Sequence, residues 1–312
     1  MIRFTGVSKR FADAARPAVD AIHLTIPEGE TCALIGPSGC GKSTTLRMVN
    51  RLVEPDAGTI HLAGEALSGI EPIRLRRRIG YVLQGVGLFP HWTVARNIAT
   101  VPELLGWSKT RTAARIDAML DLVGLDPDEF RGRRPDALSG GQRQRVGVAR
   151  ALAADPPVLL MDEPFGAVDP VARGRLQTEI GAILKRLNKT VILVTHDLDE
   201  AVRMGDRIVL MRDGRIVQAD TPDRLLARPA DGFVADFVGP DRALRRLAGL
   251  DVGDLARLGS SEDGPVIAYD APVRDALSLM LETGADHVRV AGLDEPSSLS
   301  LAAIRAASAP AG

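Results

Sequence analysis

The chain has little cysteine, little lysine and no long apolar run. Cys32 and Cys40 are its two cysteines, too few for a disulfide framework and typical of a reducing compartment. No apolar run approaches the roughly 18 residues needed to cross a bilayer, and residues 1–10 carry charge and lack the apolar core of a signal sequence. These absences predict a protein that stays in the cytosol.

The net charge of the chain is also small, because its positive and negative residues nearly balance. The formal net charge is −1 at pH 7, which argues against a general polyanion binder, so we expect no nucleic-acid partner. Arginine greatly outnumbers lysine. This bias is typical of genome composition, and a nucleic-acid surface is the alternative explanation. The histidines are scattered, so the sequence predicts no site built on a histidine cluster.

Short apolar runs alternate with helical patterns through about residue 220. This alternation predicts an α/β fold with a largely parallel sheet covered by helices. A mostly helical segment at residues 93–154 looks like an insertion between two halves of a nucleotide-binding core. The pair Asp213-Gly214, between two further strand patterns, predicts a hairpin. The strand patterns are residues 31–35, 79–83, 158–161 and 191–195, and the helical patterns are residues 43–51 and 172–187.

A composition shift near residues 239–240 predicts a domain boundary. It would place residues 1–240 in a large domain and residues 241–312 in a small one. Within the small domain we expect a helix over residues 241–258, a flexible link over 259–264, a β-α-β pattern over 266–290 and a frayed end over 306–312.

A glycine-rich segment follows the strand pattern of residues 31–35. Its letters GPSGCGKS match the phosphate-loop pattern G-x-x-x-x-G-K-[ST], and the strand and helix on either side argue against a chance glycine-rich turn. Glycines let the backbone wrap closely round phosphate, and the amide groups at a helix start supply positive dipoles. We expect Lys42 to reach the β- and γ-phosphates, Ser43 to ligate Mg²⁺ and Thr44 to assist at the α-phosphate. The predicted loop is Gly36, Pro37, Ser38, Gly39, Cys40, Gly41, Lys42, Ser43 and Thr44.

The strand pattern of residues 158–161 ends in Asp162-Glu163. Ligands bind at the carboxyl ends of strands in open α/β sheets, so we expect Asp162 to hold Mg²⁺ through water, opposite Ser43. Glu163 is the next residue and is placed to act as the general base for an attacking water. An apolar run that ends in Asp-Glu is common by itself. It predicts a metal and catalytic site only in combination with the phosphate loop.

Residues 138–142 have the letters LSGGQ. Ser139 is a good N-cap for the helix that follows, so this segment offers a second helix terminus to an anion. The alternative is an ordinary serine-capped helix with a flexible start. At its spacing from Lys42 and Asp162, however, the segment matches in full the signature of the ABC ATPase family, and over residues 1–240 the chain resembles that family.

The resemblance implies a P-loop NTPase of ABC type, with a RecA-like core, an antiparallel β subdomain and a helical subdomain at about residues 85–155. It implies hydrolysis of ATP with Mg²⁺. In that family two subunits pair head to tail, and the signature of one caps ATP held by the phosphate loop of the other. The residues that would act in this way across the dimer are Ser139, Gly140, Gly141 and Gln142.

Four more positions match the family's elements. Gln84 matches the glutamine that meets Mg²⁺ or water and senses the membrane subunit, and Asp169 matches the aspartate that couples the two sites. His196 matches the switch histidine that contacts the γ-phosphate, although an isolated histidine there is more often a helix start. Phe11 lies where an aromatic ring stacks on adenine, and filling of the core is its competing role.

The resemblance also implies a transporter part. The interval between Gln84 and Leu138 is too short for the long coiled coils of DNA-repair relatives, and the chain holds one cassette. It therefore needs a twin and separate integral membrane permease subunits. Residues 84–97 are the predicted docking groove for a permease, with local packing of their apolar residues as the alternative. Those apolar residues are Leu88, Phe89, Pro90 and Trp92.

The cargo is suggested by two further segments. Residues 99–107 and 237–246 are similar to importers of quaternary amines such as glycine betaine, carnitine and choline. The resemblance implies a substrate-binding protein as an indirect partner and a peripheral place on the cytoplasmic face of the membrane. Other possibilities left open are import of another small solute such as an amino acid, a non-transport ABC ATPase, and a regulatory module that holds nucleotide; Glu163 and His196 speak against the last.

Two departures from the family's pattern stand out. Residues 271–290 are similar to one CBS motif, and a full CBS module needs two. Ligand regulation, dimerisation and a vestigial role therefore all stay open for the small domain. Arg96 stands where many relatives place an acidic residue, which bears on pairing with the membrane partner.

Overall fold

The chain forms two compact units. In the computed structural model the described residues are 1–12, 14–258, 264–293 and 295–308. The first unit covers Met1–Val217 and the second covers Gln218–Gly312. The boundary predicted near residue 240 lies inside the second unit, between two of its helices. Among the described residues, no helix is both long enough and apolar enough to cross a membrane.

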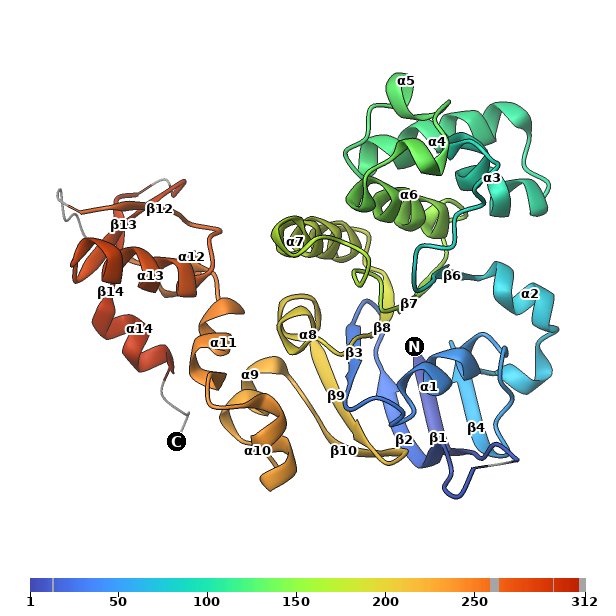
Figure 1. The fold of residues 1–312 in the computed structure, drawn as a ribbon, viewed down its shortest axis with the longest axis horizontal. Coiled ribbons are helices and arrows are strands. Elements are labelled where there is room, and N and C mark those ends of the chain that lie inside the picture. Colours follow the sequence, from blue (N-terminus) through green and yellow to red (C-terminus); the bar gives the residue numbers. More distant parts are fainter. Residues whose placement is uncertain (13, 259–263, 294, 309–312) are drawn as a thin grey trace. The chain divides into compact units, whose positions relative to one another are not determined.

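A six-stranded sheet forms the core of the first unit (Figure 1). Its strands are β3 (Thr31–Ile35), β6 (Ile79–Val82), β7 (Val158–Asp162), β8 (Thr190–Val194), β9 (Arg207–Arg212) and β10 (Arg215–Asp220). Their order is β10-β9-β3-β8-β7-β6, and β6, β7, β8, β3 and β9 pair in parallel. Every residue of β3, β7 and β8 is buried, as continuous apolar runs predict for a parallel sheet.

The turn between β9 and β10 confirms the predicted hairpin. Asp213 and Gly214 have φ angles of 50° and 81°. Positive φ at both central residues is what a two-residue type I′ turn requires, and Asp-Gly supplies it at little steric cost.

Helices cover this sheet. They are α1 (Lys42–Val49), α7 (Pro170–Arg186) and α8 (Leu198–Met204). Helix α1 packs on β7 and β8, α8 packs on β3, and α7 packs on α8. Helices α1 and α7 confirm the helices predicted over residues 43–51 and 172–187. The parallel sheet and its helices confirm the predicted α/β class.

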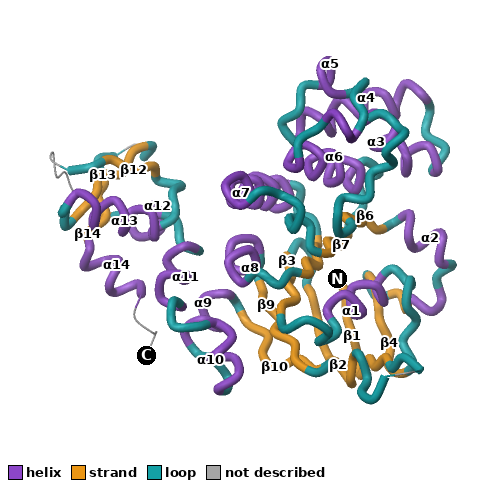
Figure 2. The backbone as a smooth tube through the Cα atoms, viewed as in Figure 1, coloured by secondary structure: helices purple, strands orange, loops and turns teal. Residues whose placement is uncertain are grey.

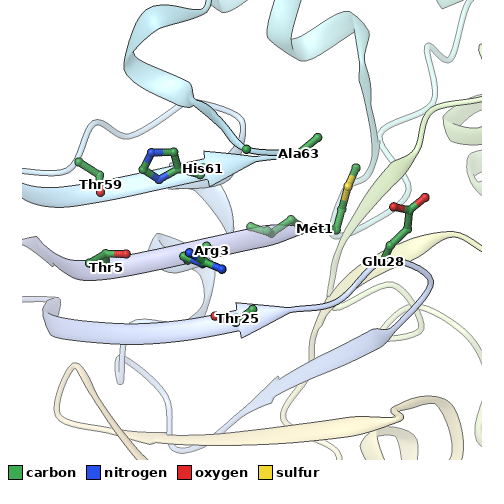
Figure 3. Close-up of a pocket in the computed structure, with 10 residues that line it drawn as sticks. Met1, Arg3, Thr5, Thr25, Glu28, Thr59, His61 and Ala63 are labelled. Carbon is green, nitrogen blue, oxygen red and sulfur yellow. The ribbon is translucent and has the colours of Figure 1, made fainter.

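A four-stranded antiparallel sheet lies beside the parallel one. Its strands, in the order β2-β1-β4-β5, are β2 (Val19–Ile26), β1 (Ile2–Lys9), β4 (Ala57–Leu62) and β5 (Glu65–Ala66). The inner face belongs to one apolar core with α1, β7 and β8, to which Ile2, Phe4 and Ile60 contribute. The outer face lines a cavity of about 780 Å³, where Arg3, Thr25 and His61 project from neighbouring strands (Figure 3). No predicted site residue lines this cavity.

The segments between β5 and β6 and between β6 and β7 are mostly helical. A short 3₁₀ turn, η1 (Leu67–Gly69), and helix α2 (Pro72–Arg77) come before β6. After β6 come α3 (Val94–Leu104), α4 (Lys109–Leu122), α5 (Pro127–Phe130), the 3₁₀ turn η2 (Pro135–Ala137) and α6 (Gly140–Leu152). Helices α3, α4 and α6 pack on one another, and Figure 2 shows this part as helices and loops alone. It is the helical subdomain expected at about residues 85–155.

The second unit is a smaller α/β unit. Its helices are α9 (Pro222–Ala227), α10 (Gly232–Val238), α11 (Arg242–Ala248), α12 (Val252–Leu255), α13 (Val273–Thr283) and α14 (Leu301–Ser308). Its strands, in the order β11-β14-β13-β12, are β11 (Arg257–Leu258), β14 (Ser297–Ser300), β13 (His287–Ala291) and β12 (Val266–Ala268). Leu247, Val288 and Leu299 lie in its own apolar core. The run from β12 to α14 has the order β-α-β-β-α, and its likeness to a CBS motif stays a prediction.

Two predictions about the second unit were wrong. The single helix expected over residues 241–258 is divided, because α11 ends at Ala248 and the backbone N–H of Val252 then donates to the carbonyl of Ala271. The frayed end expected over residues 306–312 was wrong for residues 306–308, which belong to α14, and residues 309–312 lie outside the described residues. Ile304 is buried in the core and the carbonyl of Ser308 accepts a hydrogen bond from Arg246. The link expected over residues 259–264 lies almost wholly outside the described residues.

Candidate nucleotide-binding and hydrolysis site

A cavity of about 490 Å³ opens beside the start of α1. Three segments that are far apart in the sequence line it. They meet because β3, β7 and β8 are parallel neighbours and their carboxyl ends lie at one edge of the sheet. The lining residues are Ser38, Gly39, Gly41, Lys42, Ser43, Thr44, Glu163 and His196, each of which the sequence motifs had placed in the nucleotide site.

Glycine is required at two positions of the phosphate loop. Gly36 has φ +141° and Gly41 has φ +107°, a region that L side chains rarely adopt. A Cβ on Gly36 would lie 2.2 Å from the carbonyl oxygen of Met211, and one on Gly41 would lie 2.2 Å from that of Ala18. The backbone of β9 and of the residues before β2 therefore presses on the loop and fixes its shape.

The ammonium group of Lys42 is held inside the phosphate loop. Lys42 is 7% exposed, and its ammonium donates to the carbonyl oxygens of Gly36 at 2.7 Å and Pro37 at 3.0 Å. The thiol of Cys40 is buried beside it, with Sγ 3.7 Å from Nζ. A buried ammonium is stabilised here by the loop's own carbonyls, and it lies at the wall of the cavity where a phosphate would sit.

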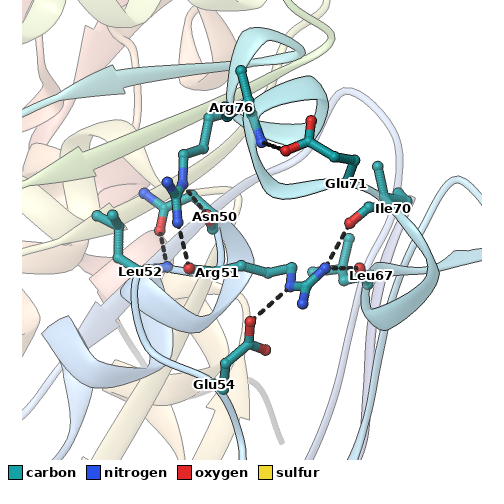
Figure 4. A network of polar contacts seen from close by, with 9 residues as sticks. Asn50, Arg51, Leu52, Glu54, Leu67, Ile70, Glu71 and Arg76 are labelled. Atoms are coloured by element: carbon teal, nitrogen blue, oxygen red, sulfur yellow. Dashed lines mark hydrogen bonds and ion pairs between the residues drawn. The ribbon is translucent and has the colours of Figure 1, made fainter.

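The far end of α1 is held by a network of arginines (Figure 4). The Arg51 guanidinium donates to the carbonyls of Leu67 and Ile70 and to Glu54. Arg76 of α2 donates to the carbonyls of Asn50 and Arg51, the two residues that follow α1. Helix α1 is therefore fixed at both ends, which keeps its N-terminus aimed at the cavity.

The carboxylate of Asp162 is next to the start of α1. It is 3% exposed, and its Oδ1 accepts a hydrogen bond from the Ser43 hydroxyl at 3.0 Å. Arg47, one turn further along α1, brings Nη2 within 3.5 Å of the other carboxylate oxygen. Burial, and then the charge of Asp162, raise the pKa of Tyr81. Arg47 and Tyr81 could not be predicted as site residues from the sequence, because neither belongs to a motif.

The predicted general base, Glu163, lies between Gln84 and His196, two further side chains of the predicted catalytic set. Gln84 donates through Nε2 to Oε2 of Glu163 at 3.1 Å, and Nδ1 of His196 is 3.5 Å from Oε1 of the same carboxylate. Glu163 has φ +45°, and its backbone N–H donates to the carbonyl of Val194. A non-glycine residue in this conformation costs of order 1–3 kcal/mol and is typical of functional sites, where surrounding structure holds it in place.

The signature segment begins α6 as predicted. Ser139 accepts from the N–H of Gln142 at 3.2 Å, and the Gln142 side chain accepts from the N–H of Ser139 at 2.9 Å, which is a complete capping box. Asp169 caps α7 in a similar way by accepting from the N–H of Ala172. None of the signature residues, nor Asp169, is among the residues that line the cavity of the same chain.

Phe11 also lies outside that lining. Its side chain is 45% exposed, and the Lys9 ammonium is 5.7 Å from the ring centroid. The competing role as core filler is therefore wrong, and stacking on adenine stays a prediction.

The segment predicted to dock a permease has a groove beside it. A cavity of about 260 Å³ between the sheet and the helical subdomain is lined by Leu83, Phe89, Arg77 and Arg150, among others. Local packing, the alternative explanation, is also present: the rings of Phe89 and Trp92 are 4.3 Å apart. Buried Asn97 fixes this loop by hydrogen bonds to both the N–H and the carbonyl of Phe89.

Comparisons with known proteins agree with this geometry. Residues 19–166 match the family model of the ABC transporter. An osmoprotectant import ATP-binding protein of Salmonella typhimurium is 49% identical over 90% of this chain and 73% of that protein. A glycine betaine uptake system ATP-binding protein of Escherichia coli is 51% identical over 94% of each chain.

Solved structures give the same result. A dimeric ATP-binding cassette in a post-hydrolysis state with bound ADP and phosphate has a TM-score of 0.63 and 31% identity, over 71% of this chain and 98% of that chain. A subunit of a Clostridium perfringens ABC transporter complex has a TM-score of 0.67 and 26% identity, over 73% of this chain and 91% of that chain. The phosphate loop, the signature segment and the acid pair thus stand in the fold that these relatives share, and the chain belongs to the family of ATP-binding, ATP-hydrolysing subunits of ABC transporters.

Proposed function

We propose that this chain energises the import of a quaternary-amine osmoprotectant of the glycine betaine and choline class. The support is the likeness to the two relatives named above and to a choline transport ATP-binding protein of Bacillus subtilis, 45% identical over 93% of this chain and 75% of that protein. The names of two of these relatives give a quaternary amine, glycine betaine or choline, and the name of the third gives an osmoprotectant. The sequence segments at residues 99–107 and 237–246 point to the same class.

Hydrolysis by this chain is supported most directly by the position of Glu163. Its carboxylate faces the cavity above the phosphate loop, between Gln84 and His196. A general base must lie within hydrogen-bond reach of the water it activates, and it must be oriented by neighbours. Gln84 supplies that orientation by donating to one oxygen, which leaves the other to accept a proton from water.

Lys42 and the loop would hold the transferred phosphate. The ammonium exchanges the carbonyls of Gly36 and Pro37 for the more negative β- and γ-phosphate oxygens, which form stronger, charge-assisted hydrogen bonds. His196 is largely exposed on the opposite wall. From there its imidazole can contact the γ-phosphate and stabilise charge that develops during transfer.

The residues around Ser43 fit a magnesium ion. The Ser43 hydroxyl and the Asp162 carboxylate are hard oxygen donors 3.0 Å apart at the edge of the cavity, and Mg²⁺ is usually held by one or two protein oxygens together with phosphates and waters. In this proposal Ser43, Asp162 and Gln84 hold the ion, directly or through water. When bound, it neutralises charge on the phosphates.

A second copy would complete each site. Ser139, Gly140, Gly141 and Gln142 do not line the cavity of their own chain, and the related cassette with ADP and phosphate is dimeric. A head-to-tail pair lets the capped start of α6 from one chain face the γ-phosphate held by the other. Asp169 then couples the two sites.

The remaining partners follow from the family. We assign the groove lined by Leu83, Phe89, Arg77 and Arg150 to an integral membrane permease subunit, at the cytoplasmic face of the membrane. A separate substrate-binding protein would deliver the solute. The unit after the cassette, including the predicted small domain of residues 241–312, has its own core and is free to carry a separate regulatory or dimerising role.

Glu163→Gln tests the hydrolytic part of this proposal. The amide keeps the size of the side chain and cannot act as a base, so we expect ATP binding to persist and turnover to fall roughly 10²–10⁴-fold. Phosphate release and equilibrium binding of ATP would be measured on the same preparation. Near-normal phosphate release by the variant would refute the assignment of Glu163.

Uptake assays test the cargo. The chain would be expressed with its own permease and receptor in cells that lack other osmoprotectant uptake, and accumulation of labelled glycine betaine, choline, proline and spermidine would be compared. Spermidine is included because a spermidine/putrescine import ATP-binding protein of Pseudomonas aeruginosa is 40% identical over 90% of this chain. We expect uptake of a quaternary amine that disappears with Glu163→Gln. Uptake of spermidine or proline alone would reject the cargo and leave the ATPase assignment intact.

A further inference from the structure

A buried polar cluster lies directly behind the loop that carries His196. Glu200 of α8 is 4% exposed, and its Oε2 accepts a hydrogen bond from the hydroxyl of Thr195 at 3.0 Å. Thr195 is 1% exposed and is the residue immediately before His196. The same hydroxyl accepts from the backbone N–H of Asp197 at 3.0 Å. The Thr195 hydroxyl thus connects three groups: its own residue before His196, the backbone N–H of Asp197 after it, and the carboxyl of Glu200.

The other side of the cluster reaches the segment that ends at Asp169. Arg173 of α7 donates through Nη2 to the carbonyl of Val168 at 2.9 Å. Its Nε is buried, as is Oε1 of Glu200, and neither atom has a hydrogen-bond partner among the described residues. Burial raises the pKa of Glu200 and the charge of Arg173 opposes that rise, so the two side chains lie within electrostatic range of each other.

Packing alone does not account for a carboxyl in this position. An apolar side chain would fill the space between α7 and α8 without the cost of burying a polar group. The groups that act on Glu200 are Asp197 and Glu163, which are acidic, and Arg173, which is basic. Burial outweighs the other influences and raises the pKa of Glu200 to about 8. Within the part of the chain that the structure describes, the one hydrogen bond of this costly buried carboxyl comes from Thr195 in the loop of His196.

We propose that Glu200 is a positioning residue for hydrolysis: through its hydrogen bond with Thr195 it fixes the loop that bears His196, and its electrostatic interaction with Arg173 couples that loop to the segment that ends at Asp169. The inference rests on the proposed catalytic roles of Glu163 and His196. It adds a connection inside each chain between the histidine that faces its own nucleotide and the aspartate predicted to couple the two sites.

The hydroxyl of Thr195 offers the sharpest test. Thr195→Val keeps the shape of the side chain and removes the hydroxyl, and Thr195→Ser restores it. Thr190→Val is a matched control, because Thr190 is fully buried at the start of β8, the strand that Thr195 follows, and its hydroxyl also accepts from a backbone N–H, that of Gly29 at 3.0 Å. All three variants would be prepared as the full chain, with kcat, the KM for ATP and the melting temperature measured for each.

We expect Thr195→Val to lower kcat about tenfold, in the range that loss of one fixed catalytic orientation produces, with the KM for ATP changed less than twofold because the phosphate loop is untouched. Thr195→Ser should recover most of the lost kcat. Thr190→Val should lower the melting temperature by a similar amount as Thr195→Val and leave kcat unchanged. Equal kcat values for Thr195→Val and Thr190→Val would overturn the proposal, since they would show that only stability is involved.

Variants of Glu200 separate its hydrogen bond from its charge. Glu200→Gln keeps an oxygen that can accept from Thr195, so we expect at least half of the normal kcat, whereas Glu200→Leu should lower kcat as much as Thr195→Val does. Combining Arg173→Met with Glu200→Leu should cost less than the product of the two single effects, because both act through one connection. Independent effects would remove Arg173 from the proposal.

Failure of this inference can be told from failure of the proposed function. If Glu163→Gln is inactive and Thr195→Val is normal, the hydrolytic assignment stands and the positioning role is refuted. If Glu163→Gln is itself normal, the roles of Glu163 and His196 on which the inference rests are refuted as well. Should Glu200→Leu not fold, the comparison of Thr195→Val with Thr195→Ser still decides the question.

Discussion

The phosphate loop and the signature segment are both glycine-rich starts of helices, but their surroundings differ. In the phosphate loop, backbone carbonyls press on Gly36 and Gly41, and Lys42 is buried against the loop itself. In the signature segment, a Cβ on Gly141 would meet no atom within 4 Å. The chain itself therefore demands glycine in the phosphate loop and makes no such demand at Gly141, which fits a requirement imposed by a second copy.

The largest effect is expected on the phosphate-loop side. Lys42→Ala removes the one buried cation of the loop, so productive ATP binding should be lost and turnover should fall below detection. Binding of labelled ATP in the presence of Mg²⁺ measures this directly. Retained tight Mg-ATP binding would count heavily against the role of Lys42 and would break the contrast between the two segments.

For the signature segment we expect a loss of turnover without a loss of stability. Gly141→Asp places a carboxylate where the chain leaves open space, so the melting temperature should change little, while turnover should fall roughly 10²-fold because the new charge repels the γ-phosphate of the twin. Mixing this variant with Lys42→Ala should recover turnover that neither shows alone, since one site of a mixed dimer has both an intact loop and an intact signature. No recovery in a mixture that is shown to form mixed dimers would contradict the head-to-tail arrangement.

One effect of pH on stability should come from Glu200 of α8, the helix that packs on strand β3 before the phosphate loop. Glu200 behind β8 has its pKa raised from 4.5 to about 8, so the folded chain keeps a proton that the unfolded chain releases. The stability contributed by this group is complete below about pH 4.5 and is lost as the pH rises through about 8. Denaturant unfolding from pH 5 to pH 9 should therefore favour Glu200→Gln increasingly over the unmodified chain. A constant difference between the two would contradict the buried, protonated state of Glu200.

The smallest effect is expected from the cap of the signature helix. Ser139→Ala removes one half of the capping box, which should cost about 1 kcal/mol of stability, typical of an exposed N-cap. Thermal unfolding would detect it as a shift of a few degrees. If turnover falls much more than stability, Ser139 also contacts the nucleotide of the twin, and the contrast with the self-contained phosphate loop becomes sharper.

Sequence patterns were most accurate where one physical constraint acts locally. Continuous apolar runs predicted β3, β7 and β8, and Asp213-Gly214 predicted the turn between β9 and β10 because few other residues tolerate two successive positive φ angles. The pattern failed for β14, whose letters SSLS are mostly polar although Ser297 is buried beside Leu299. The pattern of small residues also failed to predict the end of α14. The helix continues to Ser308, because the buried side chain of Ile304 anchors it to the core.

Four features follow from neighbouring residues in the chain and could be predicted from them alone: the phosphate loop, the acid pair after β7, the capped signature segment, and the alternation that builds a parallel sheet. Three other features became visible only once the chain was folded. Gln84 donates to Glu163 beside His196, Arg76 donates to the carbonyl that follows α1, and the Thr195 hydroxyl donates to Glu200. These contacts join residues from separate elements. Their geometry depends on how parallel strands and helices pack, and no local pattern of letters carries that information.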